Sequence, residues 1–206
     1  MDTGLLVDPA VSRAKFAREL ANYRRQEDEY IRRGWWMVRA EYPEVFVVFG
    51  TPHLMPPSAI FGVLLDFTNY DFWPPSVKLV NPFSREPFKW QELPAPARLH
   101  RSVPVAVPIS AQFEAMGVPP GQVINQVQTL MQSHGPDLIP FMCLAGVREY
   151  HHHPGHTGDH WLQYRRSGRG TLADILNTIY KYGVEPITYD IQTVFQIVYQ
   201  QQGAPQ

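Results

Sequence analysis

Apolar residues recur at helical spacing near the N-terminus, and charged residues fall mostly between them. The apolar positions that share one helical face are Phe16, Leu20, Tyr23 and Tyr30. Asp8 followed by Pro9 is a typical helix start, because Asp accepts free backbone N–H groups and Pro is tolerated at the first helical position. The pattern predicts one amphipathic helix that begins at Pro9 and ends near Arg33-Gly34.

Four runs rich in β-branched and aromatic residues follow this helix. They cover residues 35–42, 45–49, 60–67 and 77–80. Pro43-Glu44 suits a short antiparallel connection between the first two runs, and Pro74-Pro75 separates the last two. The succession predicts a four-stranded antiparallel meander.

The second half of the chain is harder to assign, because prolines interrupt its first part. The chain has 20 prolines, and a helix cannot persist where they cluster. We therefore expect residues 84–120 to be irregular and residues 121–131 to form a helix. Later apolar periodicity predicts helices over 171–182, with Thr171 as cap and Gly183 as stop, and over 186–200.

This order of elements predicts a single α+β domain over residues 1–206, with its sheet covered on one side. Residues 201–206 are expected to fray. The net charge is -1 and the pI is about 6.7, so no overall field favours nucleic acid or an anionic membrane surface. We expect neither as a partner.

Other features of the sequence point to a cytoplasmic protein without a cofactor. No apolar run is long enough to span a bilayer, and the N-terminus lacks a signal-peptide pattern. A single cysteine cannot form an internal disulfide, which agrees with a reducing compartment. The Gly168-Arg169-Gly170 run lacks a phosphate-binding fingerprint, so no nucleotide is expected.

The single cysteine is the strongest candidate for chemistry. Cys143 lies in an apolar run over residues 140–145, and a histidine-rich loop follows. The loop contains His151, His152, His153, His156 and His160. A thiolate is a strong nucleophile near neutral pH, and imidazole is a common partner in covalent catalysis. The alternative is a buried cysteine with no chemical role, since free Cys is among the most buried residue types.

Three segments together resemble the ubiquitin-conjugating (E2) enzyme family. Residues 67–82 are similar to the stretch in which one strand of that fold ends at an aromatic and proline run and the next begins. Residues 142–144, Met-Cys-Leu, resemble the active-site tripeptide. Trp161 and the helix predicted over 171–182 resemble the tryptophan and helix that follow the family's cysteine. The resemblance implies a UBC-like fold, with residues 84–138 as a long insertion before the cysteine loop and the C-terminal helices.

The resemblance implies that Cys143 accepts a ubiquitin-like protein from an E1-like activating enzyme as a thioester and passes it to an amine or target protein. The family's His-Pro-Asn motif falls where this chain has Arg-Glu-Pro at 85–87, so its oxyanion donor is not carried over. The nearest donors along the chain are His151, His153 and His156, and we expect His153 or His156 to act. Such divergence resembles the proteins of bacterial ubiquitin-like conjugation operons, some of which are linked to antiviral defence.

Other interpretations of the same residues remain open. In the family the first helix docks the activating enzyme through basic residues, which here are Arg13, Lys15 and Arg18, although a solvated surface is the default explanation for them. The histidines could bind zinc with Cys143, but their spacing matches no compact template. The chain could also be a non-catalytic binding protein with this fold, or a Cys-His hydrolase.

Overall fold

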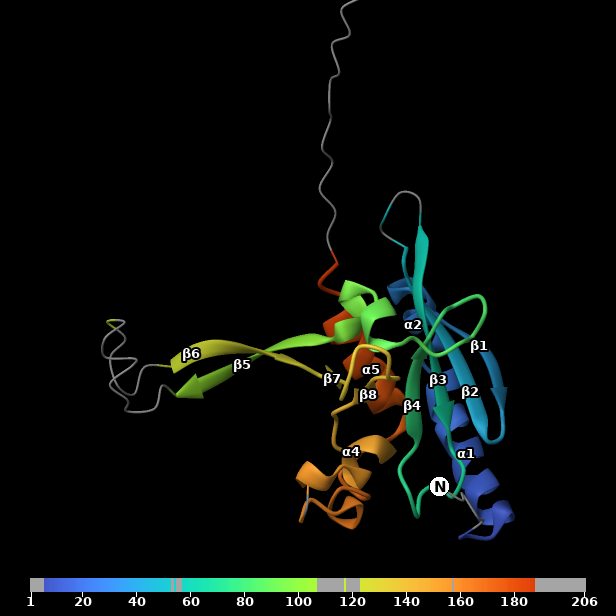
Figure 1. The fold of residues 1–206 in the computed structure, drawn as a ribbon. Coiled ribbons are helices and arrows are strands. Elements are labelled where there is room, and N and C mark those ends of the chain that lie inside the picture. The colour runs from blue at the N-terminus through green and yellow to red at the C-terminus, as the bar shows by residue number, and fades with distance from the viewer. Residues whose placement is uncertain are drawn as a thin grey trace, which may run out of the picture.

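A four-stranded antiparallel sheet with helices against one face forms the body of the protein in a computed structural model (Figure 1). The structure describes residues 6–52, 54, 57–106, 117, 123–156 and 158–187. The strands follow one another in the order β1-β2-β3-β4, each antiparallel to the next. The α+β class and the four-stranded meander that the sequence predicts are confirmed.

The first half of the chain forms the sheet and two helices that precede it. These elements are α1 (Pro9–Arg24), α2 (Glu27–Arg33), β1 (Trp35–Glu41), β2 (Glu44–Thr51), β3 (Ser58–Asp66) and β4 (Ser76–Val80). The second half contains shorter strands and helices. They are β5 (His100–Ala106), β6 (Val123–Thr129), β7 (Met131–Gln132), β8 (Phe141–Met142), α4 (Arg148–His152) and α5 (Leu172–Gly183). Four 3-10 turns cover Trp90–Glu92, Ala95–Arg98, Pro154–His156 and Trp161–Gln163.

The N-terminal helix is broken, whereas the sequence predicted one continuous helix. Asp8 caps α1 as expected, accepting the N–H of Ala10 at 2.8 Å, but α1 ends at Arg24 and α2 starts at Glu27. In an unbroken helix, residues seven positions apart are separated by about 10 Å along the axis. The rings of Tyr23 and Tyr30 are 4.9 Å apart, so the break lets both pack against the same part of the core.

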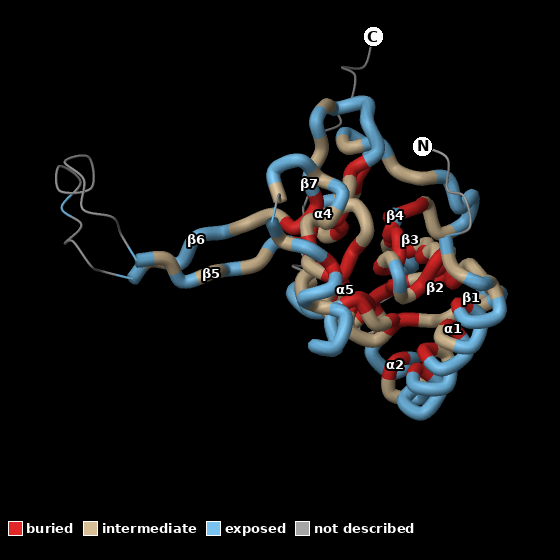
Figure 2. The backbone as a smooth tube through the Cα atoms, turned by 90° about the horizontal axis from the view of Figure 1, so that it is seen from below, coloured by how far each residue is buried: buried red, intermediate tan, exposed pale blue. Residues whose placement is uncertain are grey.

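The core lies between the helices and one face of the sheet (Figure 2). Trp35, at the start of β1, stacks on Phe49 at 5.6 Å and on Tyr180 of α5 at 5.8 Å. The side chains of Trp35 and Phe49 are fully buried. Burial of aromatic rings is the largest apolar contribution per residue to folding, so this stack fixes α5 on the sheet.

A β-hairpin replaces the helix predicted over residues 121–131. Strand β6 pairs antiparallel with β5 along its length, from His100 opposite Thr129 to Ala106 opposite Val123. This ribbon projects away from the body (Figures 1 and 2). The helix prediction was wrong because cross-strand pairing with a segment about 25 residues earlier decides the conformation, and Val123 and Val127 remain exposed where the helix would have buried them.

Helix α5 follows the prediction closely. The hydroxyl of Thr171 accepts the N–H of Asp174 at 3.2 Å and caps the helix, and Gly183 is its last residue. The helix predicted from Pro186 and the frayed tail at 201–206 lie outside the described residues, except for Pro186 and Ile187. No helix within the described ranges is both long and apolar enough to cross a membrane.

Candidate functional site

Cys143 lies directly after β8, at the base of the projecting hairpin. Its backbone N–H donates to the carbonyl of Leu130 at 2.7 Å, which fixes it beside the residue that links β6 to β7. The thiol is partly exposed and opens on a cavity of about 350 Å³. The other lining residues are Arg101, Gln128, Thr129, Leu130 and Gln132. Cys143 is therefore accessible and is not a core residue.

The structure places His156 beside the thiol. Cys143 Sγ lies 3.4 Å from His156 Nε2, although the two residues are thirteen positions apart in the chain. The ring of Tyr150 stacks on the imidazole of His156 at 3.9 Å between centroids. The stacked Tyr150 ring holds the imidazole with Nε2 near the sulfur, where an unprotonated Nε2 can receive the thiol proton.

Asp159 accepts hydrogen bonds from two tyrosines of the histidine-rich loop. Its carboxylate accepts hydrogen bonds from the hydroxyls of Tyr150 and Tyr164, and these two bonds lower the pKa of Asp159 below its ordinary value. Burial, followed by the bond to Asp159, raises the pKa of Tyr150. The tyrosine therefore stays a neutral donor, and its ring stays in place against His156.

Arg148 and Glu149 anchor the short helix α4 to the sheet. The Arg148 guanidinium donates to the carbonyls of Pro74, Asp66 and Thr68 at 3.1, 3.1 and 2.7 Å. It also pairs with the Asp66 carboxylate at 3.2 Å. The Glu149 carboxylate accepts bonds from Ser76 and from the N–H of Val77. Since bonds to charged groups are the strong ones, the cysteine loop has a rigid base.

A contact between two glycine backbones joins the cysteine loop to the start of α5. Gly146 and Gly170 have φ angles of +100° and +68°, which L side chains rarely adopt. A Cβ atom on Gly170 would lie 2.6 Å from the carbonyl oxygen of Gly146 and 2.8 Å from the Trp161 ring. Trp161 is itself buried and donates its indole N–H to the Asp71 carbonyl at 3.0 Å. Side chains at either glycine would therefore separate the two segments.

Two opposing effects act on the Cys143 thiol. Burial raises its pKa, and the positive charge of Arg101 lowers it, with a net increase above the ordinary value. Arg101 is held in place because its Nε and Nη2 donate to the side-chain oxygen of Gln128 at 3.2 and 3.0 Å. A thiol with a raised pKa is mostly protonated near neutral pH, so a nearby base such as His156 increases the supply of thiolate.

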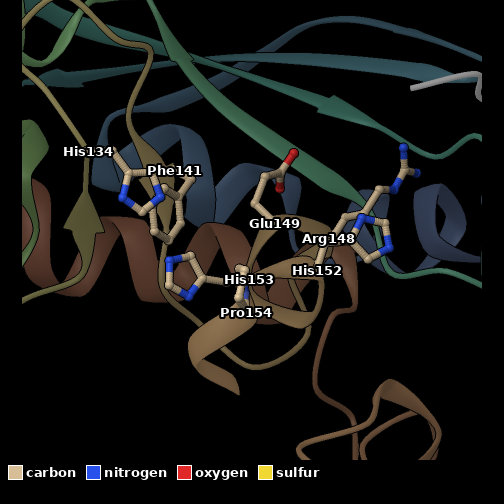
Figure 3. A pocket seen from close by; sticks show the side chains of 7 residues that line it. All are labelled: His134, Phe141, Arg148, Glu149, His152, His153 and Pro154. Carbon is tan, nitrogen blue, oxygen red and sulfur yellow. The ribbon is translucent and has the colours of Figure 1, made fainter. Parts of the chain in front are cut away.

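His153 packs mainly against two other rings, although its own ring also lies 5.6 Å from that of His156. Its ring stacks on His134 at 5.3 Å and on Phe141 at 5.1 Å, and its Nδ1 accepts the N–H of Gly155 at 3.1 Å. These rings line a cavity of about 290 Å³ together with Arg148, Glu149, His152 and Pro154. Figure 3 shows His134, Phe141 and His153 gathered on one side of this cavity. Of the two histidines that the sequence favoured, the structure brings His156 to the thiol and directs His153 to the aromatic stack.

His151 has a structural role in the same loop. Its Nε2 accepts the N–H of Gly146 at 3.0 Å, and its Nδ1 contacts the carbonyl of Asp159 at 2.8 Å. Within the part of the chain that the structure describes, no three His, Cys, Asp or Glu side chains gather closely enough to hold a metal ion. The zinc site considered from the sequence therefore has no support in these ranges.

Sequence reasoning missed several residues around the thiol. Arg101 and Gln128 lie in the segment regarded as an insertion, and only the pairing of β5 with β6 brings them to Cys143. Tyr150 and Asp159 are in the histidine-rich loop, but their roles depend on a turn whose geometry no residue spacing reveals. His160 was grouped with the other histidines, yet it is exposed and caps the turn at Trp161.

The fold and the site together define an α+β protein with an accessible thiol paired with an imidazole. Over residues 7–187 the sequence matches the Y4jH-like family, and the chain belongs to that family. It is 38% identical over 187 residues to the uncharacterized protein y4jH of Sinorhizobium fredii (strain NBRC 101917 / NGR234). The match covers 87% of this chain and 85% of the relative. Neither the family description nor the relative's name states an activity.

Proposed function

We propose that the protein is an E2-like carrier that accepts a ubiquitin-like protein from an E1-like activating enzyme as a thioester on Cys143. The observation that carries the proposal is the 3.4 Å approach of the accessible Cys143 thiol to His156. The resemblance of residues 67–82, 142–144 and the Trp161 region to ubiquitin-conjugating enzymes, together with the four-stranded meander, adds support.

The first step exchanges one thioester for another. The Cys143 sulfur attacks the carbonyl carbon of the incoming thioester, and its proton passes to His156 Nε2. The carbon–sulfur bond to the activating enzyme then breaks, and the departing thiolate takes up a proton. Because the bonds broken and formed are of the same kind, the step needs little more than a reachable thiolate.

The second step transfers the modifier to an amine of a target protein. The amine nitrogen attacks the thioester carbonyl, loses a proton, and the Cys143 sulfur leaves as a thiolate. His156 is positioned to remove that proton or to stabilise the developing charge, since imidazole both accepts and donates protons near neutral pH. His153 remains a candidate for the same role only if its stack with His134 and Phe141 rearranges.

A Cys-His hydrolase is the second candidate, and the same thiol–imidazole pair favours it. In a hydrolase, water attacks the acyl group on Cys143 and a free acid is released. A non-catalytic role for Cys143 is less well supported, because the side chain is partly exposed and lines a cavity. The three functions differ in what becomes of an acyl group on the sulfur.

A direct experiment follows the fate of that acyl group. The protein is mixed with a short synthetic peptide thioester, and intact mass is recorded in buffer with and without added lysine. A carrier gives an acyl-Cys143 species that persists in buffer and is discharged by the amine. Rapid release of free acid without lysine indicates a hydrolase, and acylation no faster than that of free cysteine contradicts both.

A further inference from the structure

A second cavity, of about 290 Å³, lies beside α5 and shares Arg101 with the cavity at Cys143. Its other lining residues are Leu144, Arg169, Asp174, Asn177, Thr178, Lys181 and Tyr182. Five of these residues recur along α5 at helical spacing, so they form one polar stripe of the helix. The opposite stripe, which includes Ile175 and Ile179, is buried in the core.

Three cations converge on this cavity, and they face a single carboxylate. Arg101, Arg169 and Lys181 form no ion pair within the described ranges of the chain. Elsewhere in the same ranges, several arginines are paired with Asp or Glu. A group of unpaired cations around one cavity repels itself unless an anion enters, so the charge distribution favours a negatively charged ligand.

Two neutral side chains of the stripe each donate a hydrogen bond to the helix backbone. The Thr178 hydroxyl donates to the Asp174 carbonyl at 2.8 Å, and the Asn177 amide donates to the Ala173 carbonyl at 2.8 Å. Arg101 is already oriented by Gln128. The cationic side chains are therefore the main groups left to bind a ligand, and Arg101 approaches it in a fixed orientation.

The carboxylate of Asp174 opposes the attraction of the three cations for an anion. Its carboxyl accepts the N–H of Gly170 at 3.3 Å, and burial raises its pKa despite the opposing effects of Arg169 and of that bond. An anion in the cavity would lie near this carboxylate, and repulsion between the two weakens binding. Removal of the Asp174 charge is therefore expected to have the opposite effect to removal of a cation.

We infer that this cavity binds a compact oxyanion, such as a phosphate or carboxylate group, through Arg101, Arg169 and Lys181. Because Arg101 also lines the cavity at Cys143, the ligand shares a cation with the thiol. An occupied site neutralises part of the Arg101 charge, and the thiol then forms a thiolate less readily. The site is separate from whatever Cys143 accepts, and it couples anion binding to the reactivity of the sulfur.

Binding is tested by calorimetric titration with inorganic phosphate, pyrophosphate and succinate at constant ionic strength maintained with chloride. Arg169→Gln and Lys181→Gln are each expected to weaken binding about tenfold, as for loss of a charged hydrogen bond, whereas Asp174→Asn strengthens it. Arg166→Gln removes the same charge from an exposed neighbour outside the lining and leaves binding unchanged. Preference for phosphates or for succinate identifies which oxyanion the site takes.

Thiol reactivity provides the second measurement. In the wild-type protein, a saturating concentration of the best anion should slow alkylation of Cys143 by iodoacetamide severalfold, and in Lys181→Gln the same concentration should have little effect. Phosphate and succinate that bind no better than chloride would overturn the inference. Equal affinity in wild type, Asp174→Asn and Lys181→Gln would overturn it as well.

Discussion

The backbone N–H of Gly146 donates to Nε2 of His151 at 3.0 Å. Because Nε2 is the acceptor, the proton of the neutral ring is on Nδ1, which faces the Asp159 carbonyl at 2.8 Å. His151 therefore joins the segment after Cys143 to the far end of the histidine-rich loop. Protonation of Nε2 would break this link, so the loop that carries His156 depends on a neutral histidine.

Stability is expected to fall in mild acid. Burial lowers the pKa of His151 and of His152 below the ordinary value of 6.5, so the unfolded chain takes up protons more readily than the folded protein. The contribution of these neutral histidines to the free energy of unfolding is fully present above pH 6.5. It is lost as the pH falls through their lower folded-state pKa. Urea unfolding between about pH 7.5 and about pH 5.5 measures this loss.

His151→Gln keeps a polar side chain and removes the titration, so the decline in stability with pH becomes shallower. His100→Gln is the control, because His100 is an exposed histidine outside the loop. An equal decline in wild type and His151→Gln would show that His151 does not control the acid stability of the loop.

Gly170→Ala is expected to destabilise the protein by about 1–3 kcal/mol, because the new methyl group overlaps Gly146 and Trp161. Gly168→Ala is the control for backbone strain alone. Its φ is also positive, at +86°, but a Cβ there meets no atom within 4 Å. Thermal unfolding should rank the variants with Gly170→Ala lowest; equal losses would mean that the close contact contributes nothing.

His156→Ala should slow transfer from charged Cys143 to amines on the order of hundredfold, the usual contribution of a positioned acid or base. Loading of Cys143 should slow to a smaller extent, because another base in solution can take the thiol proton and thioester exchange then needs only a reachable thiolate. His153→Ala should slow discharge much less, since the His153 ring packs on His134 and Phe141 and lies beside His156 but not at the sulfur. The rate of single-turnover discharge from charged Cys143 to lysine is measured for both variants. If the two alanine variants are slowed equally, the approach of His156 to the sulfur does not explain the chemistry.

Reversal of charge at Arg13 and Arg18 should slow loading about tenfold at low salt by weakening association with the activating enzyme. Arg18 is 60% exposed in its side chain, and Arg13 lies over the Tyr42 ring at 5.2 Å. Lys15 is less suited to docking, because it pairs with Asp71 at 2.5 Å.

The control for this prediction is Lys78→Glu/Lys89→Glu, which reverses two exposed charges elsewhere. Its loading kinetics are compared with those of Arg13→Glu/Arg18→Glu. Equal rates in the two double variants would remove α1 from the docking surface.

The sheet and α5 could be predicted from sequence because their patterns are local. Runs of β-branched and aromatic residues between proline breaks define β1 to β4, and an apolar stripe with a Thr171 cap defines α5. The hairpin could not be predicted in the same way. Strand β6 contains β-branched residues that favour a strand, but its apolar positions also fit helical spacing, and its pairing with β5, which a long segment separates from it, decides between the two.

The candidate site was predictable only in part. A single cysteine followed by a histidine-rich loop directed attention to Cys143 and His156, but residue spacing could not separate His156 from His153. A turn at Pro154–His156 and stacking on Tyr150 bring one imidazole to the sulfur. The place of Arg101 beside the thiol could not be predicted for a different reason, since the pairing of β5 with β6 brings it there.

The central claim is tested most directly by charging the protein itself. Purified protein is mixed with its ubiquitin-like protein, the E1-like activating enzyme and ATP, and intact mass is recorded without reductant. A covalent adduct at Cys143 that excess thiol removes is predicted, and Cys143→Ser should either lose it or convert it into a reductant-resistant ester. A charged activating enzyme that leaves the wild-type protein unmodified, or a thiol-sensitive adduct that persists in Cys143→Ser, would contradict the account.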